Sequence, residues 1–131
     1  MEVTLLEMLE ARERRAARQQ VLLRDYGKTM ICFTMNIAGP VKNSSLIRRG
    51  YALGKRLLRQ QLEVAGIPIA YSEEIQEKTG NEAIFLLDAD PLAVKAITVE
   101  IEDQPAVGRL FDMDVLCPNG RKVDRQELGL S

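Results

Sequence analysis

The chain has 131 residues, of which 46% are hydrophobic and 28% are charged, and its formal net charge is −1. This balance predicts one folded domain over residues 1–131 and excludes a long disordered chain. A net charge near zero provides no overall field for a nucleic-acid backbone. No apolar run has the length of a membrane span, and residues 1–10 lack the order of a secretory signal, so neither nucleic acid nor a membrane is an expected partner.

Two residue counts narrow the chemistry further. The sequence has no histidine, so serine–histidine and cysteine–histidine nucleophile pairs are excluded and proton transfer falls to carboxylates, lysine or metal-bound water. Its two cysteines, Cys32 and Cys117, lie far apart and lack CxxC spacing. They favour a reducing, cytoplasmic compartment over a disulfide framework or a zinc site.

The N-terminal segment predicts a long helix. Thr4 and Glu7 have the spacing of a capping box, and Gly27 provides a stop, so the helix is expected over about residues 5–25. The middle of this segment is polar on nearly every side, whereas leucines and valine lie towards its ends. We therefore expect the helix to dock by its ends and not along its length.

The remaining chain predicts four strands and two further helices. Strands are expected at residues 28–37, 67–75, 83–87 and 107–116, where apolar residues alternate or are β-branched. One helix is expected from a cap at Asn43 or Ser44 to Gly66, and the other from Pro91 to about residue 102.

This order of elements predicts an α+β fold of the ferredoxin-like split βαβ type. In that arrangement a βαββαβ core, here about residues 28–124, forms an antiparallel sheet with helices on one face. The N-terminal helix is an addition to the core. After a turn at residues 118–120, a short strand at residues 121–123 is expected to complete a C-terminal β-hairpin.

The segment Gly108 to Val115 is the first candidate site. In a strand, Asp112 and Asp114 share one face and lie roughly 6.5–7 Å apart, so the two carboxylates can hold Mg²⁺ against substrate phosphates. The alternative is a half-exposed strand with an acidic face, although two like charges side by side destabilise such a strand. Arg109 joins this site only if the strand bulges at Gly108 or begins later.

The loop at residues 39–45 and the helix after it form the second candidate. The first turn of a helix offers unpaired N–H groups to an anion, and Lys42, Ser44, Arg48 and Arg49 lie at or near this turn. Arginines at this end of a helix interact unfavourably with the helix dipole, and a bound phosphate would offset that cost. The alternative is that these residues form a solvated basic face of the helix. Gly50 and Gly54, four residues apart, permit close approach of either a ligand or the sheet.

The third candidate is a group of arginines in the N-terminal helix, at positions 12, 14, 15 and 18. Guanidinium groups bind carboxylates and phosphates through paired hydrogen bonds, so this helix can receive an acidic partner protein or a triphosphate. Because glutamates are interleaved with the arginines, a merely solvated helix face is the alternative.

Three segments together carry a family resemblance: EARERRAARQQ (residues 10–20), FTMNIAGPVK (33–42) and GRLFDMDV (108–115). In this order and spacing they resemble the citrate lyase holo-acyl-carrier-protein synthases, the apo-citrate lyase phosphoribosyl-dephospho-CoA transferases. The resemblance covers essentially the whole chain. It departs at residues 105–109, where family members often carry a histidine, and family members tend to continue past residue 130 into a cysteine-rich tail.

The resemblance implies a transferase reaction. A serine of the citrate lyase acyl carrier protein (the γ subunit) attacks 2′-(5″-triphosphoribosyl)-3′-dephospho-CoA, a phosphodiester forms, and diphosphate leaves. The expected catalytic residues are Arg109, Asp112 and Asp114, with Mg²⁺ held by the two aspartates. Lys42, Ser44, Arg48 and Arg49 are expected to bind the phosphates, and Arg14, Arg15 and Arg18 the partner protein.

Two other functions compete with this transferase. One is a non-catalytic ferredoxin-like module that binds a carrier protein or a nucleotide-like ligand. The other is a metal-dependent nucleotidyltransferase with a different acceptor. An RNA-binding module of the RRM type is disfavoured, because only 5% of the residues are aromatic and the strands lack stacking aromatics.

Overall fold

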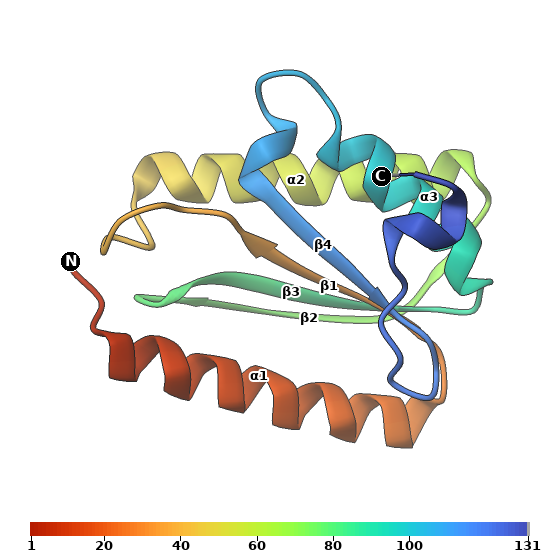
Figure 1. The fold of residues 1–131 in the computed structure, drawn as a ribbon, viewed down its shortest axis with the longest axis horizontal. Helices are drawn as coiled ribbons and strands as arrows, with labels where there is room; N and C mark the ends of the chain where they lie inside the picture. Colours follow the sequence, from red (N-terminus) through yellow and green to blue (C-terminus); the bar gives the residue numbers. More distant parts are fainter. Residues whose placement is uncertain (131) are drawn as a thin grey trace.

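The computed structural model describes residues 1–130 and has three α-helices and a four-stranded antiparallel sheet (Figure 1). The elements in chain order are α1 (Leu5–Tyr26), β1 (Thr29–Met35), α2 (Ser45–Val64), β2 (Ile69–Glu77), β3 (Gly80–Leu87), α3 (Pro91–Glu102), the 3₁₀ turn η1 (Gly108–Leu110), β4 (Phe111–Leu116) and the 3₁₀ turn η2 (Arg125–Leu128). The predicted α+β class is confirmed. None of the helices within residues 1–130 has the length and apolar character to cross a membrane.

The sheet has the strand order β2-β3-β1-β4, and each neighbouring pair is antiparallel. The strand β1 lies between β3 and β4: Ile31 is opposite Phe85 on one side and opposite Val115 on the other. The strand β4 is therefore an edge strand, and its outer side is available to the C-terminal segment.

Helices cover both faces of this sheet (Figure 1). On one face, α2 and α3 bury the main core, in which Phe33 and Met113 of the sheet are packed with Tyr51 and Ile101. On the other face, a smaller cluster packs Leu22 and Leu23 of α1 against the sheet residues Met30, Cys32, Ile84 and Leu86. The residues from Thr29 to Phe33 are consequently buried in succession.

The helix α2 approaches the sheet very closely at Gly54. A Cβ atom at this position would overlap the ring of Phe33 and lie 2.9 Å from Cε1 of Phe111. At Gly50 it would meet the flexible end of Met35 at 3.1 Å. Of the two explanations for this pair of glycines, packing of the helix on the sheet is the one that the structure supports.

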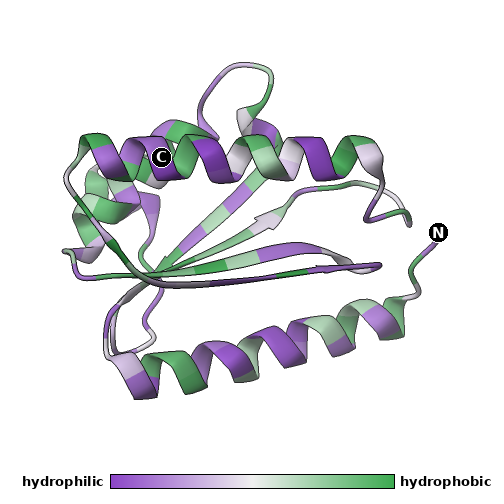
Figure 2. Cartoon of the chain, turned by 180° about the vertical axis from the view of Figure 1, so that it is seen from behind, coloured by the Kyte–Doolittle hydropathy of each residue, from purple (hydrophilic) through white to green (hydrophobic). Residues whose placement is uncertain are grey.

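The helix α1 docks differently from the prediction. Its C-terminal end packs through Leu22 and Leu23, but Leu5, Leu6 and Leu9 at the other end are exposed. Its hydrophilic middle, which Figure 2 shows in purple, lies against the sheet and is held there by ion pairs. Sequence patterning misses this contact because the pairing glutamates, Glu73 and Glu82, lie more than fifty residues away.

Two predicted strands are shorter than expected. The strand expected from residue 107 begins at Phe111, because Gly108–Leu110 form a 3₁₀ turn packed on the end of α3. The C-terminal hairpin is reduced to one isolated bridge, Leu116↔Lys122. Asp124 and Glu127 then form a capping box that starts η2 and turns the chain away from the sheet.

Candidate active site

A cleft of about 240 Å³ lies between the first half of α1 and the sheet. Its lining residues come from five segments distant in sequence: Met8, Arg12 and Arg15; Thr34, Met35, Asn36 and Ile37; Lys42; Thr79, Gly80, Asn81 and Glu82; and Asp112. The polar part of α1 therefore forms one wall, and the end of β1 with the starts of β3 and β4 forms the other. Polar and charged groups of both signs line the cleft.

Three cationic side chains line this cleft. The guanidinium group of Arg15 lies 3.1 Å from the Glu82 carboxylate, which Arg14 also contacts at 2.9 Å. Lys42 donates a hydrogen bond from Nζ to the carbonyl oxygen of Ile37, and within residues 1–130 it has no carboxylate partner. Arg12 is exposed and forms no ion pair with any described residue. Arg12 and Lys42 thus offer positive charge that forms no ion pair within residues 1–130, which suits them to bind an anion.

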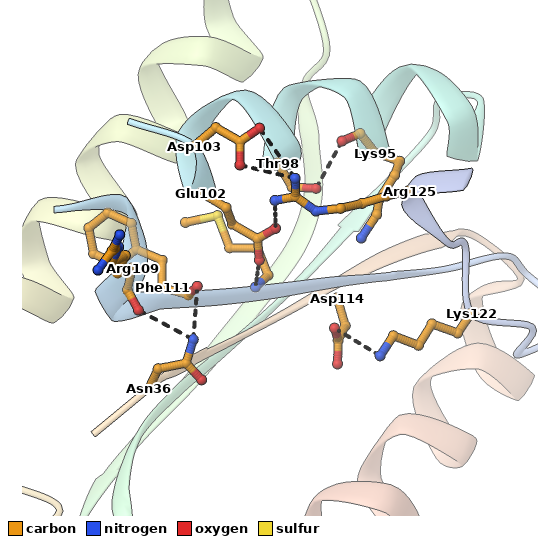
Figure 3. A network of polar contacts seen from close by, with 11 residues as sticks. Asn36, Lys95, Thr98, Glu102, Asp103, Arg109, Phe111, Asp114, Lys122 and Arg125 are labelled. Carbon is orange, nitrogen blue, oxygen red and sulfur yellow. Dashed lines mark hydrogen bonds and ion pairs between the residues drawn. The ribbon is translucent and has the colours of Figure 1, made fainter. Parts of the chain in front are cut away.

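Asp112 and Asp114 lie on the α1 side of β4. Their cross-strand partners are Thr34 and Cys32, and Cys32 belongs to the cluster under α1, so both carboxylates share that face. Asp112 lines the cleft. Asp114 lies beside Lys122, with 3.3 Å between Oδ1 and Nζ (Figure 3).

The environment of Asp112 favours its protonated form. Burial, followed by the negative charge of Asp114, raises the pKa of Asp112 from its ordinary value of 3.8 to about 6. Bringing a cation to the pair would favour the ionised form and reverse this shift. A carboxylate that is costly to ionise, with a second carboxylate beside it, therefore suits a hard cation such as Mg²⁺, which prefers oxygen ligands.

This raised pKa predicts a pH-dependent gain in stability for Asp112→Asn. Below about pH 4 the carboxyl is protonated in both folded and unfolded chains, so the group contributes no difference. Above about pH 6 it is ionised in both, and the folded state bears the unfavourable charge. We expect the variant to melt at a higher temperature than the parent above pH 6, with the difference disappearing towards pH 4. Thermal melts from pH 4 to pH 8 measure it, and a difference independent of pH would contradict the assignment.

The loop that carries Lys42 is fixed by side-chain amides. Asn43 and Asn81 exchange hydrogen bonds of 3.0 and 3.1 Å, and Asn43 also donates to the carbonyl oxygen of Glu77 at 2.8 Å. Ser44 is the N-cap of α2, where its hydroxyl accepts a hydrogen bond from the Ile47 amide. Ser44 therefore contributes to the start of the helix, and it does not line the cleft.

Several of the other predicted site residues lie outside the cleft. Arg48, Arg49 and Arg109 are exposed, lie outside the cleft lining and form no ion pair within residues 1–130. Figure 3 shows Arg109 near the start of β4, well separated from Asp114. Arg18 instead binds Glu73 on β2 through two hydrogen bonds of 2.6 and 2.8 Å. The expected phosphate and partner roles of these arginines stay predictions.

The sequence did not single out several residues of the cleft. Asn36 is one: its backbone amide donates to the Leu110 carbonyl at 2.8 Å, and this contact ties the end of β1 to η1. Arg12 was grouped with the other arginines of its helix. Arg12 differs from the others in its direction around the helix axis. Arg15 and Arg18 lie towards the sheet, whereas Arg12 lies about a quarter turn round the helix from the buried residue Ala11.

Comparison with known proteins gives these residues a family context. Residues 3–131 match the family described as apo-citrate lyase phosphoribosyl-dephospho-CoA transferase. The chain belongs to this family. Proteins of that name from Citrobacter koseri and Escherichia coli O139:H28 are each 32% identical over 128 residues, which cover 98% of this chain and 70% of theirs. A protein named CitXG from Haemophilus influenzae is 34% identical over 131 residues, but the chain spans only 28% of its length.

Family membership confirms the function that the three sequence segments predicted. The chain is a phosphoribosyl-dephospho-CoA transferase of the citrate lyase system, which attaches the prosthetic group. In the structure, Asp112 lines the same cleft as Arg12 and Lys42, two cationic side chains that form no ion pair with a described residue.

Proposed function

We propose that this cleft is the active site, where the chain transfers the phosphoribosyl-dephospho-CoA group from 2′-(5″-triphosphoribosyl)-3′-dephospho-CoA to a serine of the citrate lyase acyl carrier protein. One observation carries the proposal: Arg12, Lys42 and Asp112 come from three distant segments and line the same cleft. Arg12 and Lys42 bind the triphosphate, whose negative charge compensates theirs.

The reaction is a substitution at phosphorus. The serine oxygen of the carrier attacks the phosphorus attached to the ribose, and a phosphodiester bond forms. The bond from this phosphorus to the bridging oxygen of the diphosphate breaks, and the serine proton passes to a base or to solvent. Catalysis of this type depends mainly on positioning and on stabilisation of charge, and fixed cations in a partly enclosed cleft provide both.

Mg²⁺ is the proposed cofactor, held by Asp112 and Asp114. Within residues 1–130 no group of three or more metal-binding side chains gathers, but two carboxylates suit an ion that takes its other ligands from phosphate and water. When bound, Mg²⁺ would neutralise charge on the phosphates. The protein's own part is to orient the two carboxylates on β4 and to hold Arg12 and Lys42 in the cleft that Asp112 lines.

The proposal extends to partner, fold and compartment. The acceptor is the acyl carrier protein named in the reaction, and the two free cysteines, Cys32 and Cys117, suit a reducing cytoplasm. The strand order β2-β3-β1-β4 and the α2 and α3 crossovers support a ferredoxin-like core with α1 added on the open face of the sheet.

A mass measurement tests the transferase directly. The chain is incubated with the triphosphoribosyl donor, Mg²⁺ and the apo carrier protein, and the carrier is analysed by intact-mass spectrometry. We expect one added phosphoribosyl-dephospho-CoA group per carrier, lost when the acceptor serine is replaced by alanine. Binding of the carrier without a mass increase would point to a non-catalytic module, and modification of unrelated proteins would point to another acceptor.

A further inference from the structure

A second hollow lies on the outer side of β4. It measures about 530 Å³ and is formed by α3, β4 and the C-terminal segment around η2. Its charged lining consists of Lys95 and Glu102 of α3, Asp112 and Asp114 of β4, and Lys122, Asp124 and Arg125 of the C-terminal segment. Asp112 lines this hollow and the cleft under α1, so the two spaces meet at this residue.

Several charges in the hollow compensate one another. Glu102 accepts a hydrogen bond from the backbone N–H of Met113 at 2.7 Å and lies 3.2 Å from Arg125. Arg125 also contacts Asp103 at 3.0 Å, and Lys122 lies beside Asp114. Figure 3 shows these contacts gathered along the outer edge of β4. They leave the lysine of α3 without a counterpart.

Lys95 is 5% exposed, yet its ammonium group forms no hydrogen bond or ion pair with residues 1–130. Only its backbone takes part in a polar contact, with the Thr98 hydroxyl at 3.1 Å. The pKa of Glu127 is lowered mainly by Arg121, which binds its carboxylate at 2.9 Å, and only last by the more distant charge of Lys95. Among the described residues only the Thr79 hydroxyl is buried without a hydrogen-bond partner, so the ammonium group of Lys95 is accessible from the hollow, where an anion can bind it. In Figure 3 the side chain extends from α3 into the hollow, towards Asp114 and Lys122.

We propose that this hollow is a second phosphate-binding subsite, in which Lys95 binds a diphosphate group. The inference rests on the proposed function, because the donor carries two separate phosphate groups: the triphosphate on its added ribose and the diphosphate of its dephospho-CoA portion. Two neighbouring spaces that meet at Asp112 suit such a molecule. With the triphosphate in the cleft under α1, the dephospho-CoA diphosphate reaches Lys95 round the edge of β4. A compact ammonium group with three donors matches phosphate oxygens.

Calorimetry with Lys95→Met tests the subsite without requiring turnover. The probes are dephospho-CoA and inorganic diphosphate, measured separately with Mg²⁺. Methionine keeps the length of the buried stem and removes the charge. Lys28→Met is the matched control, since Lys28 lies immediately before β1 and its one ion pair is a 3.8 Å contact with the exposed Asp88. We expect Lys95→Met to weaken dephospho-CoA binding by at least about tenfold, Lys95→Arg to weaken it less, and Lys28→Met to leave it unchanged.

The two probes separate the sources of the diphosphate group. A loss confined to dephospho-CoA identifies its own diphosphate, whereas a loss for inorganic diphosphate identifies the leaving group as the occupant; either result supports the subsite. Unchanged affinities for both probes in Lys95→Met would overturn it. A lower melting temperature with unchanged affinities would assign Lys95 a structural role and overturn it equally. Failure of the carrier to gain mass, with Lys95-dependent binding intact, would reject the transfer reaction alone.

Discussion

Replacing Asp112 and Asp114 together by asparagine is expected to reduce prosthetic-group transfer by about a thousandfold or more. Asparagine preserves the size of each side chain but removes the negative charges that would hold a cation against the triphosphate. Because the aspartates share one face of β4 and one of them lines the cleft, the loss should appear in kcat and not only in the KM for the donor. Steady-state transfer assays at varied donor and Mg²⁺ concentrations measure this.

The control for this double variant is Asp88→Asn, which removes an aspartate whose side chain is 82% exposed and lies outside the cleft. We expect it to retain full activity. The double variant should also be at least as stable as the parent at neutral pH, since it removes two carboxylates that repel each other. An inactive double variant that melts at a lower temperature would indicate loss of the fold, and a fully active one would remove the metal from the mechanism.

The acidic pair illustrates what local patterning can predict. The period of two along a strand placed Asp112 and Asp114 on one face, whichever residue began the strand. The capping box of Thr4 and Glu7, the glycine stop after α1 and Pro91 at the start of α3 likewise act within a few residues, and the structure has them where the sequence placed them. Local rules fixed these features because their physical causes are local.

The arginines show where such rules end. Arg14, Arg15 and Arg18 suggested a docking surface on a helix, but they face sheet glutamates that are distant in sequence. Helical phase alone cannot say which side of a polar helix is covered, because that depends on charges elsewhere in the chain. The same limit concealed Lys95, which is the one basic residue of a largely apolar helix.

The largest effect on stability is expected from Gly108→Ala. A Cβ atom at Gly108 would overlap the carbonyl oxygen of Glu102 and lie 2.7 Å from its carbonyl carbon, and 3.0 Å from the carbonyl oxygen of Ile101. These are backbone atoms at the end of α3, so no side-chain rotation relieves the overlap. We expect a loss of about 3 kcal/mol in the free energy of unfolding, which lowers the melting temperature by roughly 10 °C.

Gly50→Ala is the matched control for this substitution. Its added Cβ would lie 3.1 Å from the flexible end of Met35 and at an ordinary contact distance of 3.8 Å from Leu110. Alanine favours a helix over glycine by about 1 kcal/mol. The two opposing effects predict little change in its melting temperature. A melting temperature changed as little by Gly108→Ala as by Gly50→Ala would show that α3 and η1 can separate freely, contrary to the contact described.

Gly108→Ala should also reduce transfer under conditions where the variant is still folded. The residue that it displaces, Glu102, holds the backbone N–H of Met113, which lies between the two aspartates of β4. A shift of α3 would therefore move Asp112 and Asp114 relative to Arg12 and Lys42, whose positions depend on α1 and on the loop before α2. Assays well below the melting temperature separate this effect from unfolding. We expect kcat to fall while inorganic diphosphate still binds. The substitution displaces the two aspartates and so alters the catalytic geometry, whereas it alters the positions of Arg12 and Lys42 less.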